Sequence, residues 1–157
     1  MAFLVALQVY SVRDYAEKDL KGTLEKIKEM GYDGVEFAGL YGNQASEVKS
    51  MVEELGLIPV SAHVPIEEML ADPDKVIGDY AEIGCKYIAI PYLTEERRPG
   101  QAGFEKTIKE IEMLAKVAKK HGIQMLYHNH DFEFVKVDGE YGLDIIYNTI
   151  SEDLLKT

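Results

Sequence analysis

Apolar residues follow two spacings along this chain, in alternation. Short apolar runs predict β-strands, and longer stretches with an apolar residue every three or four positions predict amphipathic helices. The strands are expected at Phe3–Tyr10, Gly34–Ala38, Pro59–Val64, Tyr87–Pro91 and Gln124–His130. Four helices are expected between them, around residues 20–30, 48–55, 76–83 and 108–118.

A glycine stands at the end of each predicted helix. These four glycines are Gly31, Gly56, Gly84 and Gly122. Many helices end on a residue in the left-handed conformation, which glycine adopts without strain. The four positions therefore separate each helix from the strand that follows it.

Strand and helix in repeated alternation predict a parallel sheet with right-handed crossovers, either open or closed into a barrel. The turn at Gln8–Asp14 contains no glycine, whereas the first turn of a nucleotide-binding sheet is usually glycine-rich. Polar residues gather instead at strand ends, where barrel enzymes place their active sites. We predict an α/β fold of the (β/α) TIM-barrel type, incomplete, over residues 1–157. The stretch Asp131–Asp144, with Asp138-Gly139 as a tight turn, predicts a C-terminal hairpin.

Several polar side chains are expected at one mouth of this barrel. Strand side chains alternate between the two faces, so apolar residues that pack under the helices leave their neighbours facing inward. Two imidazoles at positions i and i+2 of one strand also point the same way and are able to reach one metal or substrate. Each residue alone also fits a structural role. The six inward residues are Gln8, Tyr10, Glu36, His63, His128 and His130.

Composition narrows the function classes. The net charge of −11 argues against nucleic-acid and anionic-membrane partners, because an acidic surface repels phosphates. A single cysteine, Cys85, excludes an internal disulfide and fits a cytoplasmic location. The longest apolar run, Phe3–Leu7, is far too short to span a membrane and is interpreted as a buried strand.

Other reactive residues fit structural roles better. His121 ends a helix, where a cation suits the helix dipole. Cys85 has no evident base nearby and is expected to be a buried, inert thiol. Arg97 and Arg98 are expected in a long loop, either as a solvated pair or as a site for a substrate phosphate.

Four segments resemble the xylose isomerase-like family of sugar-phosphate isomerases and epimerases, which includes endonuclease IV-type nucleases. These segments are Leu7–Arg13, Gly31–Phe37, Ser61–His63 and Tyr127–Phe134. The resemblance implies an eight-stranded barrel with a divalent metal, Mn, Co, Mg or Zn, at its mouth.

The resemblance also implies roles for particular residues. The fifth-strand metal ligand, usually Glu in the family, falls on His128, with His130 as the nearby alternative, and the other ligands would lie beyond Thr157. Glu36 and His63 match catalytic positions, and Gln8, Tyr10 and His130 match positions that face a sugar or sugar phosphate. The implied chemistry is metal-assisted proton transfer beside a sugar carbonyl.

Other functions remain open. A dehydratase or nuclease of the same fold is possible, although the acidic charge opposes a nuclease. A non-catalytic fragment that assembles or binds small molecules also fits the sequence. Five strands would leave the first and fifth as unpaired edges, so we predict a homo-oligomer that forms through exposed strand edges.

Overall fold

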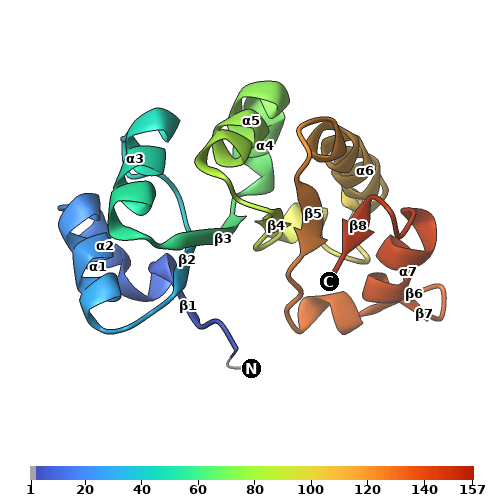
Figure 1. Ribbon diagram of the computed structural model, residues 1–157. Helices are drawn as coiled ribbons and strands as arrows, with labels where there is room; N and C mark the ends of the chain where they lie inside the picture. Colours follow the sequence, from blue (N-terminus) through green and yellow to red (C-terminus); the bar gives the residue numbers. More distant parts are fainter. Residues whose placement is uncertain (1–2) are drawn as a thin grey trace.

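The protein, described from residue 3 to residue 157 by a computed structural model, contains a six-stranded parallel sheet with helices along one face (Figure 1). Within the described residues the first strand pairs only with the second and the last only with the fifth, so the sheet does not close. The α/β prediction and the incomplete barrel are confirmed. The strand order is β1 (Ala6–Gln8), β2 (Gly34–Phe37), β3 (Ile58–His63), β4 (Tyr87–Ile90), β5 (Gln124–Tyr127) and β8 (Leu155–Lys156).

The helices follow the strands in the predicted alternation. Their apolar stripes, which include the fully buried Leu24, Val48, Ile77 and Ile111, form the core against the outer face of the sheet. Helices α2, α3, α5 and α6 are the four predicted ones. The helices are α1 (Arg13–Ala16), α2 (Leu20–Glu29), α3 (Ala45–Leu55), α4 (Ile66–Ala71), α5 (Pro73–Ile83), α6 (Phe104–Lys120) and α7 (Gly142–Thr149), with 3₁₀ turns η1 (Val9–Val12), η2 (Glu95–Arg97) and η3 (Phe132–Phe134).

Glycine ends the four predicted helices as expected. Gly31, Gly56, Gly84 and Gly122 have φ angles of 92°, 61°, 102° and 75°. All four lie in the left-handed region that costs other residues energy. The predicted boundaries between helix and strand are therefore confirmed.

The first strand is shorter than predicted at both ends. Phe3, Leu4 and Val5 precede it and are 94%, 70% and 55% exposed, so the expected buried strand is wrong there. No described strand lies on that side of β1 to cover them. At the other end the Gln8 side chain accepts a hydrogen bond from the Tyr10 backbone N–H at 2.8 Å, which turns the chain into η1.

The C-terminal region differs from the prediction in one respect and agrees in another. Strand β8 was not predicted, so the unpaired edges are β1 and β8 rather than the first and fifth strands. The predicted hairpin is present as β6 (Lys136–Val137) and β7 (Glu140–Tyr141). Asp138 and Gly139 form its turn with φ angles of 51° and 94°. Residues 132–134 form a 3₁₀ turn rather than part of the hairpin.

None of the helices in residues 3–157 combines the length and the apolar character that a membrane crossing requires.

Candidate functional site

A cavity of about 680 Å³ opens at the carboxyl ends of the strands. Five of the six residues predicted to meet at this mouth line it: Gln8, Tyr10, His63, His128 and His130. Tyr10 is delivered by η1 rather than by the strand, and His128 and His130 follow the end of β5. The sixth residue, Glu36, lies beside the lining. The remaining lining residues are Ala38, Gly39, Pro65, Glu68, Pro91 and Tyr92.

Glu36 is the centre of a hydrogen-bonded group that joins β1, β2 and β3. Its Oε1 accepts a bond from Gln8 Nε2 at 2.8 Å, and its Oε2 accepts one from Ser61 Oγ at 2.5 Å. Its Oε1 also lies 3.3 Å from His63 Nε2. Parallel pairing creates this group, because Gln8 is in register with Glu36 and Glu36 with Ser61. The carboxylate is therefore held in one orientation beside the imidazole.

His63 is the titratable member of this group that lines the cavity, beside Gln8. Burial lowers the pKa of its imidazole. The Glu36 carboxylate opposes this shift, and the neighbouring His128 and His130 add to it. At neutral pH the neutral ring is therefore favoured, with a carboxylate in place to stabilise any charge that it acquires.

The histidines that follow β5 pack against His63 and against each other. The ring centroids of His63 and His128 are 4.9 Å apart, and those of His128 and His130 are 5.1 Å apart. Within the described residues, no group of three or more His, Cys, Asp or Glu side chains is placed to hold a metal ion. The three rings thus form a wall of the cavity without forming a metal site by themselves.

The arginines after β4 serve structural contacts. Arg97 forms ion pairs with Glu67 at 2.9 Å and with Glu110 at 2.5 Å, and its side chain is 17% exposed. Arg98 donates to the Leu93 carbonyl at 3.0 Å. Neither the solvated pair nor the phosphate site expected from sequence describes these residues.

Two further predictions of structural roles agree with the contacts. His121 caps α6, and its Nε2 lies 2.9 Å from Asp74 Oδ1. Cys85 is buried, and burial raises the pKa of its thiol to about 12, which keeps it protonated.

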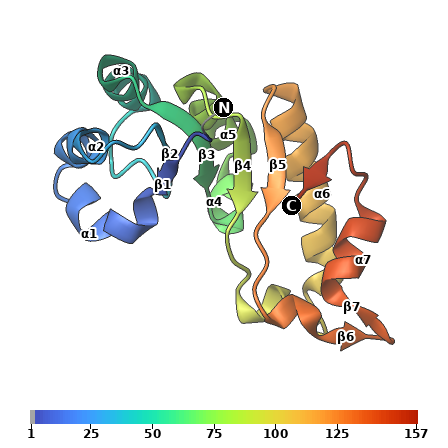
Figure 2. The same cartoon turned by 60° about the horizontal axis from the view of Figure 1, so that its bottom comes forward.

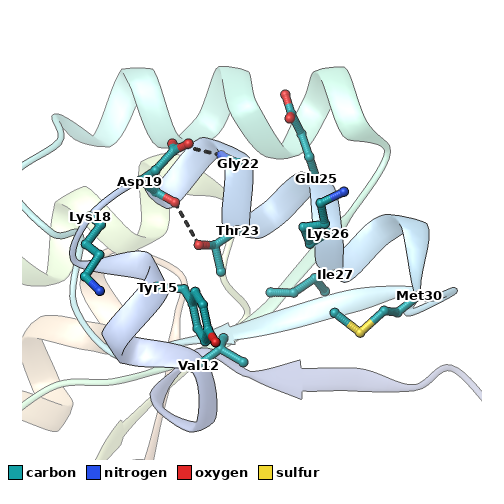
Figure 3. A pocket seen from close by; sticks show the side chains of 10 residues that line it. All are labelled: Val12, Tyr15, Lys18, Asp19, Gly22, Thr23, Glu25, Lys26, Ile27 and Met30. Atoms are coloured by element: carbon teal, nitrogen blue, oxygen red, sulfur yellow. Dashed lines mark hydrogen bonds between the residues drawn. The ribbon is translucent and has the colours of Figure 1, made fainter.

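A second cavity, of about 620 Å³, lies on the helical side, between α1 and α2 (Figure 3). Its polar contacts serve the start of α2: Asp19 Oδ1 accepts from the Gly22 N–H at 2.9 Å, and the Asp19 carbonyl accepts from Thr23 Oγ1 at 2.7 Å. Asp19 is a helix cap here, so the strand-end cavity is the better candidate for chemistry.

Three residues of the strand-end region were assigned no role from the sequence. Ser61 lies two positions before His63 on β3, and that spacing was the available signal. Tyr92 follows β4, and the sequence pattern of this strand indicates no candidate site residue. Glu133 lies within the Tyr127–Phe134 segment but is fully buried, which the sequence pattern did not indicate.

The fold and the cavity together define an α/β protein of the (β/α)-barrel type with its candidate site at the strand ends. The chain belongs to the xylose isomerase-like TIM barrel family, whose model matches residues 24–149. The sequence has no significant match among curated proteins.

Solved structures with similar folds include a sugar phosphate isomerase/epimerase from Parabacteroides distasonis, with a TM-score of 0.71 and 22% identity over 96% of this chain and 63% of that one. A xylose isomerase-like TIM barrel protein from Mycobacterium smegmatis in complex with magnesium has a TM-score of 0.68 and 13% identity over 98% of this chain and 63% of that one. A D-psicose 3-epimerase in the presence of D-fructose has a TM-score of 0.58 and 14% identity over 82% of this chain and 55% of that one.

These TM-scores establish the shared fold. The chain spans 63% of the length of the Parabacteroides structure, in agreement with a barrel that has not closed.

Proposed function

We propose that this chain carries part of the active site of a sugar isomerase or epimerase, in which His63 moves a proton beside a sugar carbonyl and Glu36 orients its ring. The observation that carries the proposal is the contact between Glu36 Oε1 and His63 Nε2, 3.3 Å, at the edge of the strand-end cavity. The sugar or sugar phosphate relationship of the similar structures supports the ligand class.

The chemistry follows from the two side chains. A neutral imidazole that carries its proton on Nε2, the nitrogen that lies 3.3 Å from the Glu36 carboxylate, keeps Nδ1 as a base. It takes a proton from the carbon next to the carbonyl, and the electron pair of the C–H bond forms an enediolate. Return of the proton by the imidazolium to the neighbouring carbon on the same face, with a hydroxyl proton passing between the two oxygens, gives an isomer. Epimerisation needs a second acid on the opposite face of the carbon, which would come from outside residues 3–157. Glu36 stabilises the imidazolium between the two steps.

Residues 3–157 do not by themselves form a closed set of ligands for the divalent metal that the family implies. A zinc site takes three or four protein ligands, and the described residues contain no group of three His, Cys, Asp or Glu side chains placed to hold a metal ion. His128 would be one ligand in a site whose other ligands come from outside residues 3–157. One similar structure is a magnesium complex, which supports a divalent ion, Mg, Mn, Co or Zn, in a complete assembly. The steps above use only the side chains of this chain.

We also propose that the chain assembles with further copies of itself in the cytoplasm and binds no nucleic acid. The unpaired strands β1 and β8 and the exposed Phe3 and Leu4 support assembly, because open edges and apolar side chains favour association. The net charge of −11 argues against a phosphate backbone as partner.

A non-catalytic small-molecule-binding fragment is the second candidate. It is favoured by the open sheet and by the incomplete metal group. This candidate predicts binding at the strand-end cavity with no exchange of the carbon-bound proton.

The experiment is exchange of sugar protons in D₂O, followed by NMR, with D-fructose and its 6-phosphate as probes. The proposal expects deuterium beside the carbonyl with the wild-type chain and its loss in His63→Gln. His121→Gln is the matched control, because that histidine caps α6 before the start of β5, at the opposite end of the strand from the cavity, and contacts Asp74 instead. Equal exchange in both variants would rule out His63 as the base. Binding without exchange in the wild type would support the second candidate.

A further inference from the structure

Glu133 is a charged residue with no solvent exposure. It lies in η3, the 3₁₀ turn that follows β5, and its relative exposure is 0%. An ionised carboxylate is costly to bury unless hydrogen bonds replace the water that it loses. The proposed proton transfer uses Glu36 and His63 and gives Glu133 no role, so the placement of this second glutamate needs its own explanation.

Both oxygens of Glu133 are hydrogen-bonded. Oε1 accepts from Tyr127 Oη at 2.6 Å, and Oε2 accepts from the backbone N–H of His130 at 2.7 Å. Tyr127 is the last residue of β5 and is buried, and burial, followed by the bond to Glu133, raises the pKa of its phenol. The carboxylate therefore joins the end of the rigid strand to the loop residue that lines the cavity.

The ring of His130 is held by aromatic packing. Its centroid lies 5.4 Å from that of Phe132, with the planes nearly parallel at 9°, and 5.3 Å from Tyr92 in an edge-on contact. Its Nδ1 is buried without a hydrogen-bond partner in the described part of the chain. Aromatic packing of this kind sets how the rings lie against one another, but it does not hold the backbone of His130. The position of the ring consequently depends on where the backbone of His130 is held.

The loop after β4 also contacts the aromatic rings that pack around His130. Loops after β4 and β5 run beside each other toward the hairpin β6–β7 (Figure 2). The Arg98 guanidinium lies 4.1 Å from the Phe132 ring centroid, and it also donates to the Tyr92 hydroxyl. The aromatic side of the cavity is therefore anchored at two points: Arg98 on Tyr92 and Glu133 on His130.

We propose that Glu133 is a positioning residue that sets the place of His130 in the cavity wall by holding its backbone N–H against the end of β5. Glu133 does not line the cavity, so it acts through His130. The value of this placement for ligand binding rests on the proposed function, but the placement itself is a property of the free protein.

The first test uses the unaltered chain and needs no ligand. Amide hydrogen exchange followed by NMR is expected to show the His130 amide as slowly exchanging as amides of β5, although His130 lies outside the strand. The Gly139 amide at the hairpin turn is the internal reference for fast exchange. Exchange of His130 at the Gly139 rate would overturn the proposal, whether or not any variant folds.

The second test separates positioning from simple stabilisation with three variants. Glu133→Gln replaces one acceptor oxygen by an amide that donates, Tyr127→Phe removes only the Oε1 partner, and Glu140→Gln is a matched change at an exposed glutamate of β7. Carbon-labelled imidazole signals report each histidine ring separately. We expect the His130 signal to broaden or split in Glu133→Gln and to stay sharp in the other two, with His121 unchanged throughout.

The stability readout makes the distinction sharp. Tyr127→Phe is expected to lower the melting temperature with the His130 signal intact. If Glu133→Gln lowers the melting temperature as Tyr127→Phe does and leaves the His130 signal sharp, Glu133 is only a structural partner of Tyr127. Because neither readout uses a sugar, absence of deuterium exchange would defeat the proposed function and leave this test standing.

Discussion

Two glutamates each hold a histidine of the same cavity, and they do so in different ways. Glu36 lies at the β2–β3 side, is partly exposed, and places its carboxylate 3.3 Å from the imidazole of His63. Glu133 lies at the β5 side, is fully buried, and bonds to the backbone of His130 rather than to its ring. A carboxylate beside a ring changes the proton affinity of that ring, whereas a carboxylate bonded to the backbone fixes where the ring stands. At one cavity, therefore, Glu36 is proposed to act on the proton transfer by His63, and Glu133 on the position of His130.

The largest difference is expected in stability. Glu133→Ala leaves the buried Tyr127 hydroxyl and the His130 N–H without an acceptor, which we expect to cost about 3 kcal/mol of unfolding free energy. Glu36→Ala is expected to cost about 1 kcal/mol, because its partners sit beside a cavity where water replaces the lost bonds. Urea unfolding of both variants measures the two values. A larger loss for Glu36→Ala would reverse the proposed division of roles.

The next difference is expected in catalysis. Glu36→Gln keeps the shape of the side chain but cannot stabilise a charged His63, so deuterium exchange into a bound sugar should slow about tenfold. Ligand affinity, measured by calorimetry, should change little because His63 still lines the cavity. An unchanged exchange rate would mean that Glu36 is only a structural acceptor for Gln8 and Ser61.

A smaller effect is expected in the pH dependence of stability. Burial lowers the pKa of His63 in the folded protein below its value of about 6.5 in the unfolded chain. The unfolded state therefore binds the proton more readily, so this contribution to stability is present above about pH 6.5 and is lost as the pH falls through the folded pKa. Thermal unfolding between pH 8 and pH 5 should be less pH-dependent in His63→Gln than in the wild type. A steeper dependence in the variant would contradict the sign.

Glu36→Gln sharpens the same measurement. Removal of the carboxylate takes away the contribution that raises the pKa of His63, so that pKa should fall further. The acid-side loss of stability should then extend to lower pH than in the wild type. Glu140→Gln, an exposed change away from the cavity, provides the control curve.

The smallest effect on stability, and a clear one on assembly, is expected at the sheet edge. The Val5 side chain is 55% exposed, and its backbone bonds to Asp33 do not depend on side-chain identity. Val5→Lys should leave the unfolding free energy within about 0.5 kcal/mol, and an edge lysine discourages strand pairing. Sedimentation should show a smaller assembled fraction than in the wild type. Full assembly in the variant would place the interface away from β1.

The regular part of the fold was open to prediction because its signals are repeated. Helical spacing followed by a glycine occurs four times, and each glycine takes the left-handed conformation. Inward parity brought Gln8, His63 and the two histidines after β5 to one cavity. These inferences use only local geometry, which each strand expresses independently of its neighbours.

The remainder depends on contacts that no local pattern records. Strand β8 has two residues, too few for any periodicity, and it exists because Leu155 packs beside β5. The early end of β1 follows from one side-chain bond between Gln8 and the Tyr10 backbone. The burial of Glu133 requires Tyr127 and His130 to be already in place. Each of these three features depends on contacts with residues elsewhere in the fold. The local sequence alone therefore does not predict strand β8, the early end of β1 or a buried Glu133.

The strand order has a consequence for the way the protein forms. Each of β1 to β4 pairs with the strand that comes next along the chain, and β8 joins β5 after one short hairpin and one helix. Each of these pairings spans no more than one crossover, so it costs less loop-closure entropy than pairing of strands more distant in the chain. A chain of this order is able to add one strand and one helix at a time as it leaves the ribosome, with each new unit docking on a finished one. Unfolding should begin at the outer units, whose edge strands have a single neighbour each, and reach β3 and β4 last.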